Sequence, residues 1–279
     1  TSEERAHVYL ADLYRAEQRV AEALHRLLSS PSVTLGGGRK SAPGSTAEPR
    51  ELIGLTDLEL IDQSFAILEE EQQEAVRQAL QQKVLVITGG PGTGKTTLLN
   101  SLLALLRRAK FSFVLAAPTG RAAKRMAESA GEEAMTIHRL LEYNPHEGGF
   151  QRREDRPLEA DVVIIDEASQ SDIQALPTLL RGKQLLIVGD DKQVSPAAVG
   201  VSEEKILQWK AADLARQPYK DVMTVDHSLY DLFTLVFSGR YVMLREHFRS
   251  VEPIIAYSNR HYYHDTIVPL RVPRANERI

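Results

Sequence analysis

The stretch that decides the fold is Val84-Leu85-Val86-Ile87-Thr88-Gly89-Gly90-Pro91-Gly92-Thr93-Gly94-Lys95-Thr96-Thr97. A short apolar run enters a glycine-rich turn of the pattern Gly-x4-Gly-Lys-Thr, and helical sequence follows the turn. A continuous apolar run of this length is typical of a buried parallel strand. A strand, such a loop and a helix in this order predict a phosphate-binding loop.

Each residue type in the loop has a physical reason. Glycines let backbone N–H groups approach phosphate oxygens without an intervening Cβ, and the following helix adds the partial positive charge of its N-terminus. Lys95 can reach the β- and γ-phosphates, and the Thr96 hydroxyl can ligate Mg²⁺. We therefore expect ATP with Mg²⁺ to be bound by the loop residues Gly90, Pro91, Gly92, Thr93, Gly94, Lys95, Thr96 and Thr97.

Polar residues follow two later apolar runs. Asp166-Glu167 comes directly after residues 161–165, and Gln193 closes the turn that follows residues 184–188. Open α/β sheets place their ligands at the carboxyl ends of strands. We expect Asp166 to hold Mg²⁺ through water, and Glu167 to orient and deprotonate the attacking water. Gln193 could sense the γ-phosphate or position that water. The alternative is a pair of solvated acids and a polar turn.

Farther out, the chain divides into segments of different character. Strands that alternate with helices from Lys83 onward predict an α/β fold with a mainly parallel sheet. Residues 1–30 form a predicted N-terminal helical segment, and the Gly- and Pro-rich residues 31–55 a predicted flexible linker. We assign residues 56–240 to the ATPase domain. Residues 241–279 should begin a second domain that is too short for a core of its own.

Composition limits the remaining choices. The 279 residues carry a formal net charge of −4, so a nucleic-acid partner would have to be met by local basic patches. The chain has no cysteine, which excludes disulfides, thiolate metal sites and cysteine nucleophiles. No stretch approaches the roughly 18 apolar residues that would cross a bilayer. We expect no membrane partner and a cytoplasmic location.

Taken together, these motifs resemble those of superfamily 1 helicases in order and spacing. The resemblance implies a RecA-like P-loop NTPase preceded by the N-terminal helical segment. Residues 71–76 are similar to the family's glutamine motif, in which Gln72 would contact adenine. Residues 117–123 and 136–141 resemble its strand-contacting motifs, and the positions matched are Pro118, Thr119, Arg121 and His138. Lys124 and Arg125, on the helix that follows, are more typical of a solvated helix face.

The resemblance changes along the chain. Residues 1–168 are similar to bacterial helicases of the RecD type, whereas residues 169–279 look more like the Upf1/Dna2-like branch, so the chain resembles a composite. Residues 244–249 and 254–260 carry the second likeness. Arg249 matches an arginine that reaches the γ-phosphate from the second RecA-like domain. The alternative is that Arg245 and Arg249 are surface charges at helical spacing.

The resemblance implies the ATP-hydrolysing core of a 5′→3′ DNA helicase, incomplete in this chain, that moves on single-stranded DNA. Two alternatives stay open: a nucleotide-binding regulatory module without motor activity, and an RNA helicase of the Upf1-like branch. The remaining helicase domains or a partner protein are not identified by the sequence. A GTPase is disfavoured, because the chain lacks the Asn/Thr-Lys-x-Asp motif that would select guanine.

Overall fold

In the computed structural model of the chain, the residues described are 63–144, 146, 149–152, 156, 158–171, 184–190, 192 and 228–273. The predicted N-terminal helical segment and the linker lie outside these residues. Gln193 does as well.

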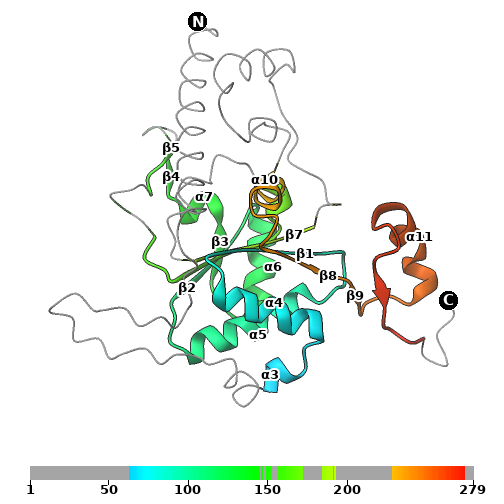
Figure 1. The fold of residues 1–279 in the computed structure, drawn as a ribbon. Coiled ribbons are helices and arrows are strands. Elements are labelled where there is room, and N and C mark those ends of the chain that lie inside the picture. The colour runs from blue at the N-terminus through cyan, green and yellow to red at the C-terminus, as the bar shows by residue number, and fades with distance from the viewer. Residues whose placement is uncertain are drawn as a thin grey trace, which may run out of the picture.

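A six-stranded sheet forms the centre of the described part (Figure 1). Every neighbouring pair in it is parallel. The spatial order is β3, β2, β6, β7, β1, β8. The strands are β1 (Val84–Gly89), β2 (Phe113–Ala117), β3 (Ala134–Thr136), β6 (Val162–Ile165), β7 (Gln184–Gly189) and β8 (Tyr241–Leu244). The α/β class with a mainly parallel sheet, expected from the sequence, is confirmed.

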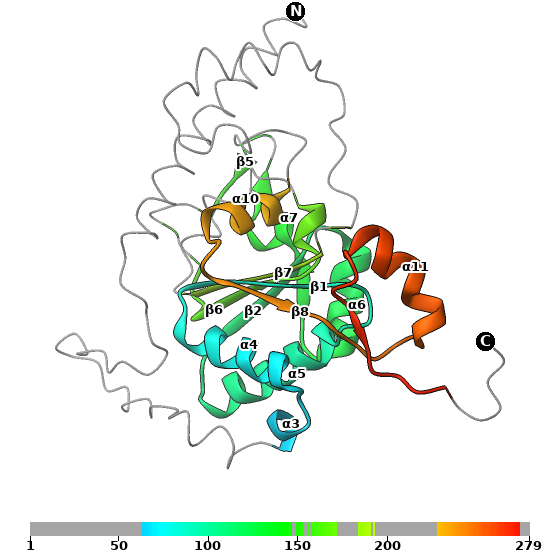
Figure 2. The same cartoon turned by 45° about the vertical axis from the view of Figure 1, so that its right-hand side comes forward.

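Helices cover both faces of the sheet (Figure 2). One face packs against α3 (Gln63–Ala66), α4 (Glu70–Gln81), α5 (Lys95–Arg108) and α6 (Gly120–Ala130). The other face packs against α7 (Ile137–Leu140) and α10 (Leu229–Val236). The central strands β1, β6 and β7 are buried along their whole length. Apolar side chains on both sides of these strands explain their uninterrupted apolar sequences.

Smaller elements complete the described chain. They are β4 (Tyr143–Asn144), β5 (Gly149–Phe150), the 3-10 turn η2 (Ala168–Gln170), β9 (Glu246–His247), α11 (Glu252–Tyr262) and β10 (Val268–Pro269). β4 and β5 form an antiparallel pair, and β9 pairs with β10 in parallel. In both views α11 lies beyond the β8 side of the sheet (Figures 1 and 2).

Strand β8 lies in the sheet, although residues 241–279 were expected to begin a second domain. It pairs with β1 in register from Val86↔Tyr241 to Gly89↔Leu244. Val242 and Leu244 are buried in the same core as α4 and α5. The predicted boundary after residue 240 therefore cuts through one sheet, because an apolar edge strand gains more by pairing with β1 than by starting a separate core. The other predicted boundaries stay predictions.

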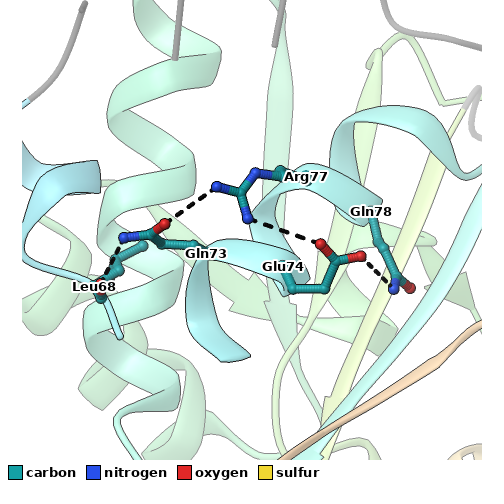
Figure 3. A network of polar contacts seen from close by, with 5 residues as sticks. All are labelled: Leu68, Gln73, Glu74, Arg77 and Gln78. Carbon is teal, nitrogen blue, oxygen red and sulfur yellow. Dashed lines mark hydrogen bonds and ion pairs between the residues drawn. The ribbon is translucent and has the colours of Figure 1, made fainter. Parts of the chain in front are cut away.

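The solvent side of α4 is held by a chain of polar contacts (Figure 3). Gln73 Nε2 donates to the Leu68 carbonyl at 2.9 Å, and Arg77 donates to Gln73 Oε1 at 3.2 Å. Glu74 accepts from Gln78 at 2.9 Å and lies 3.8 Å from the Arg77 guanidinium. The contacts among Gln73, Glu74, Arg77 and Gln78 have i,i+3 and i,i+4 spacing and support the helix, and the bond to Leu68 ties it to the preceding turn. They leave its opposite face to direct Gln72 at the phosphate loop.

Candidate nucleotide-binding site

The loop between β1 and α5 has the backbone that its glycines predicted. Gly92 and Gly94 adopt φ values of 85° and 79°, in the left-handed region that glycine enters without strain. A Cβ on Gly94 would lie 2.3 Å from Gln72 Nε2, and one on Gly92 would lie 2.7 Å from Arg249 Cβ. Neighbouring side chains therefore pack against this loop so closely that only glycine fits at these two positions.

The side chains of the loop differ in burial. Thr93 is buried, and its hydroxyl donates to the Gly90 carbonyl at 2.9 Å, which closes the turn. Thr96 and Thr97 are exposed in the first turn of α5. Exposed hydroxyls at a helix N-terminus fit the binding of phosphate and of a hard cation. Thr96 thus occupies the position that the sequence assigned to a metal ligand.

Lys95 is turned back onto the loop. Its Nζ donates to the Gly89 carbonyl at 2.5 Å and to the Gly90 carbonyl at 3.1 Å. Burial lowers the pKa of Lys95, while the nearby Asp190, Asp166 and Glu167 raise it and Arg249 lowers it further. An ammonium held by neutral carbonyls and surrounded by acids is ready to exchange them for phosphate oxygens.

Asp166 and Glu167 stand at the carboxyl end of β6. Burial raises the pKa of Asp166, partly offset by the Glu167 N–H, which donates to Asp166 Oδ1 at 2.9 Å. Glu167 has a φ of 54°, and this left-handed residue turns the chain sharply into η2. Its Oε1 receives a bond of 2.5 Å from Arg125 NH2, on α6. The two acids are both half-buried but have different partners, because Asp166 accepts from a backbone N–H and Glu167 from a side chain of another helix.

Within the described residues no cluster of three or more His, Cys, Asp or Glu could hold a metal ion. This agrees with Mg²⁺ sites of nucleotide enzymes, which use one or two protein ligands together with phosphates and water. Asp166, which follows β6, and Thr96, in the first turn of α5, have the ligand chemistry for that smaller set.

Gln72 lies beside the loop, buried, at the start of α4. Its Nε2 donates to the Thr93 carbonyl at 3.2 Å, and its Oε1 accepts from the Glu69 N–H at 3.3 Å. The glutamine therefore ties the N-terminus of α4 to the phosphate loop. The predicted contact with adenine stays a prediction.

Residues 245–271, which we call the C-terminal cover, pack over the loop. The Phe248 N–H donates to the Gly92 carbonyl at 3.0 Å. A Cβ on Gly90 would lie 2.9 Å from Ile267 Cδ1 and 3.2 Å from Tyr263 Cζ. Arg249 belongs to this cover, and the structure brings it close to Gly92 of the loop. Its predicted contact with the γ-phosphate stays a prediction. Arg245 instead pairs with Glu71, its Nε 2.7 Å from Oε1.

The sequence missed three residues of this region. Asp190, buried at the end of β7, accepts bonds of 3.1 and 3.3 Å from the Tyr263 hydroxyl. His247 is buried, which lowers its pKa, and its Nε2 accepts from the Ser250 N–H at 2.8 Å. Asp190 lies in the turn between residues 184–188 and Gln193 and could have been chosen. His247 lies within the matched residues 244–249, but the likeness assigned it no role, and no local pattern marked Tyr263.

The predicted strand-contact residues gather at the carboxyl ends of β2 and β3, where Ala117 pairs with Thr136. Thr119 caps α6 by accepting from the Ala122 N–H at 3.2 Å, and Arg121 is exposed in its first turn. His138 is exposed and lies 5.2 Å from the ring of Tyr143 and 5.7 Å from that of Phe150. Pro118, just after β2, is half-buried. These positions are adjacent, and their contact with nucleic acid stays a prediction.

A family model described as an AAA domain matches residues 72–199. That range runs across residue 168, where the likeness was expected to change branch. The composite reading stays a prediction. No helix in the described part of the chain is long and apolar enough to cross a membrane.

The chain is 32% identical over 198 residues to the ATP-dependent RecD2 DNA helicase of Deinococcus radiodurans, which covers 70% of this chain and 25% of that protein. It is 33% identical over 220 residues to the RecBCD enzyme subunit RecD of Mycobacterium tuberculosis, covering 69% of this chain and 34% of that one. A crystal structure of Bacteroides Pif1 bound to ssDNA aligns with a TM-score of 0.46 and 24% identity, over 72% of this chain and 47% of that chain.

The chain thus spans about a quarter to a third of the curated relatives it matches. The matched part holds the phosphate loop, the paired acids and the predicted strand-contact residues. Over this part the chain is similar to superfamily 1 DNA helicases of the RecD type.

Proposed function

We propose that this chain binds ATP with Mg²⁺ and hydrolyses the ATP to drive 5′→3′ movement along single-stranded DNA. One observation carries the proposal. Lys95 at the start of α5, Asp166-Glu167 after β6 and Arg249 of the C-terminal cover converge on one edge of the sheet, and the charges of the other three residues act on the pKa of Lys95. A base, a metal ligand and two cations around one phosphate loop suit phosphoryl transfer.

In the proposed reaction, the oxygen of a water molecule attacks the γ-phosphorus as the bond to the β,γ-bridging oxygen breaks. ADP leaves with that electron pair, and Glu167 takes the proton of the water. Lys95 exchanges its loop carbonyls for β- and γ-phosphate oxygens, and Arg249 balances charge that develops on the transferred group. Mg²⁺, held through Asp166 and Thr96, would supply further charge neutralisation when bound.

The position of the predicted strand-contact residues supports a coupling between DNA binding and ATP hydrolysis. β2 leads into Thr119 and α6 on one side of it, and β6, its neighbour in the sheet, leads into Asp166. The Asp166 N–H donates to the Ala116 carbonyl at 3.0 Å. A shift of the loop after β2 would therefore move Asp166 and Glu167 through the backbone bond between Ala116 and Asp166. A cytoplasmic location and further helicase domains form part of the same proposal.

The test is a coupled ATPase assay on the purified chain, with no nucleic acid, with single-stranded DNA and with single-stranded RNA of equal length. We expect hydrolysis that single-stranded DNA stimulates more than RNA. The variant Glu167→Gln should lose about 10²- to 10⁴-fold in turnover while it still binds a fluorescent ATP analogue, because a general base contributes about that much. Stronger stimulation by RNA would indicate the RNA helicase.

An opposite result would support the regulatory module. The motor proposal would be wrong if the chain binds nucleotide tightly without turnover and the Glu167→Gln variant behaves like the wild type. A fork substrate labelled on one strand then measures unwinding, and substrates with only a 5′ or only a 3′ tail test the polarity.

A further inference from the structure

Arg125 connects the predicted strand-contact residues with the proposed catalytic residues. It lies in the second turn of α6, the helix that starts at the strand-contact residue Thr119. Its NH2 is 2.5 Å from Oε1 of Glu167, the proposed base, which follows β6. The two residues are 42 positions apart in the sequence, so only the fold brings them together. The contact is thus a direct side-chain link between the proposed DNA-binding helix and the proposed base.

The surroundings of Arg125 allow it to change partner. Its side chain is 64% exposed, whereas that of Glu167 is 22% exposed. Arg121 lies one helical turn earlier and is exposed as well, so the two cations share a face of α6. A guanidinium has five N–H donors and can bind a phosphate through two parallel hydrogen bonds, whereas the hydrogen bond to Glu167 uses one of them. A strand bound along this face would therefore compete with Glu167 for Arg125.

We infer that Arg125 is a positioning residue that restrains Glu167 in the absence of nucleic acid and releases it when a strand phosphate takes the guanidinium. This inference rests on the proposed function, since it assigns a mechanism to stimulation by single strands. While Glu167 Oε1 accepts the bond from Arg125, one of its lone pairs is not available to the attacking water. Loss of that bond frees Glu167 to turn towards the γ-phosphate.

The first experiment measures ATP turnover with and without single-stranded DNA in the Arg125→Gln variant. We expect turnover without DNA to rise about two- to five-fold, the range that an exposed ion pair supports, and the stimulation by DNA to shrink by the same factor. The Arg125→Lys variant should have a turnover without DNA between those of Arg125→Gln and the wild type. Lys124→Gln, which removes the same charge from an exposed neighbour that pairs with Glu128, should leave turnover without DNA unchanged.

The second experiment needs no turnover and therefore separates this inference from the proposed function. Binding of a fluorescent single strand is measured at low salt for the wild type, Glu167→Gln, Arg125→Gln and the double variant. Removing the Glu167 charge should tighten binding about two- to five-fold, because Arg125 no longer has a competing partner. In the Arg125→Gln background the same change should have no effect. Arg125→Gln should also reduce the slope of log affinity against log salt by about one contact.

The outcomes are distinct. If Glu167→Gln tightens binding equally in both backgrounds, or in neither, Arg125 does not exchange between the two partners and the inference is wrong. A fall in turnover of Arg125→Gln without DNA would also overturn it, because the arginine would then be needed to orient the base. The chain could also fail to hydrolyse ATP and still show tighter strand binding on Glu167→Gln only when Arg125 is present. That result would support the change of partner by Arg125 and contradict the proposed ATP-driven movement.

Discussion

The phosphate loop and the C-terminal cover meet at one edge of the sheet but are built in different ways. The loop takes its shape from its own backbone, with two glycines at positive φ and the turn closed by Thr93. The cover takes its place from side chains far away in the sequence, such as Tyr263 on Asp190, 73 residues apart. The comparison teaches that a binding element can be local in sequence while the groups that complete the chemistry are not. Variants of the two regions should therefore fail in different ways.

The largest effect that we expect separates turnover from binding. Arg249→Ala should reduce ATP turnover about 10³-fold, the lower end of what an arginine finger contributes, while the affinity for nucleotide changes little. Arg245→Ala is the matched control, since it removes the same charge from the same cover but pairs with Glu71. Single-turnover hydrolysis and analogue binding measure the two quantities. Equal losses in both arginine variants would make Arg249 a surface charge.

The loop should show the opposite pattern. Lys95→Ala removes the ammonium that the buried loop directs at phosphates, so nucleotide affinity should fall about 10- to 100-fold, as expected for charged hydrogen bonds. Isothermal titration with a non-hydrolysable analogue measures it. If the nucleotide affinity of Lys95→Ala stays within two-fold of the wild type, the loop does not supply the binding energy that distinguishes it from the cover.

Glycine at position 94 should matter for stability as well as for function. Gly94→Ala puts a Cβ against Gln72 at a φ of 79°, and we expect a loss of about 2 kcal/mol in the free energy of unfolding. Gly120→Ala is the control, because a Cβ there meets nothing within 4 Å. Urea unfolding of both variants gives the comparison. If they unfold alike, the loop is less tightly packed than its geometry indicates.

The smallest effect tests how the cover is attached. Tyr263→Phe removes the hydroxyl that bonds to the buried Asp190 carboxylate, which should cost about 1.5 kcal/mol in unfolding free energy. Tyr262→Phe, on a neighbour that is 51% exposed, should cost almost nothing. Hydrogen exchange of residues 245–271 would locate the change. Faster exchange in the Tyr262 variant alone would contradict the proposed attachment.

Some errors and gaps in the sequence-based predictions have a common cause. β8 was placed in a second domain because the chain near it resembles another motif, but edge pairing with β1 depends on a neighbour more than 150 positions earlier. Arg125 was read as a solvated helix face, and its exposure agrees with that reading, yet its side chain meets Glu167, which follows the neighbouring strand β6 and is 42 positions away. Gln72 was assigned to adenine from the family motif, and its bond to the Thr93 carbonyl could not be read from residues 71–76.

The sequence by itself determined the position of the predicted phosphate loop and of the paired acids, the parallel α/β class and the resemblance to helicases. Each of these depends on residues that are close together, because glycine at positive φ, an apolar run and a strand-end acid are local requirements of the backbone. Only the tertiary structure decided that Arg249, Tyr263 and His247 cover the loop and that Arg125 holds Glu167. Such contacts depend on how distant elements pack, and an exposed arginine carries no local signal of the carboxylate that it will meet.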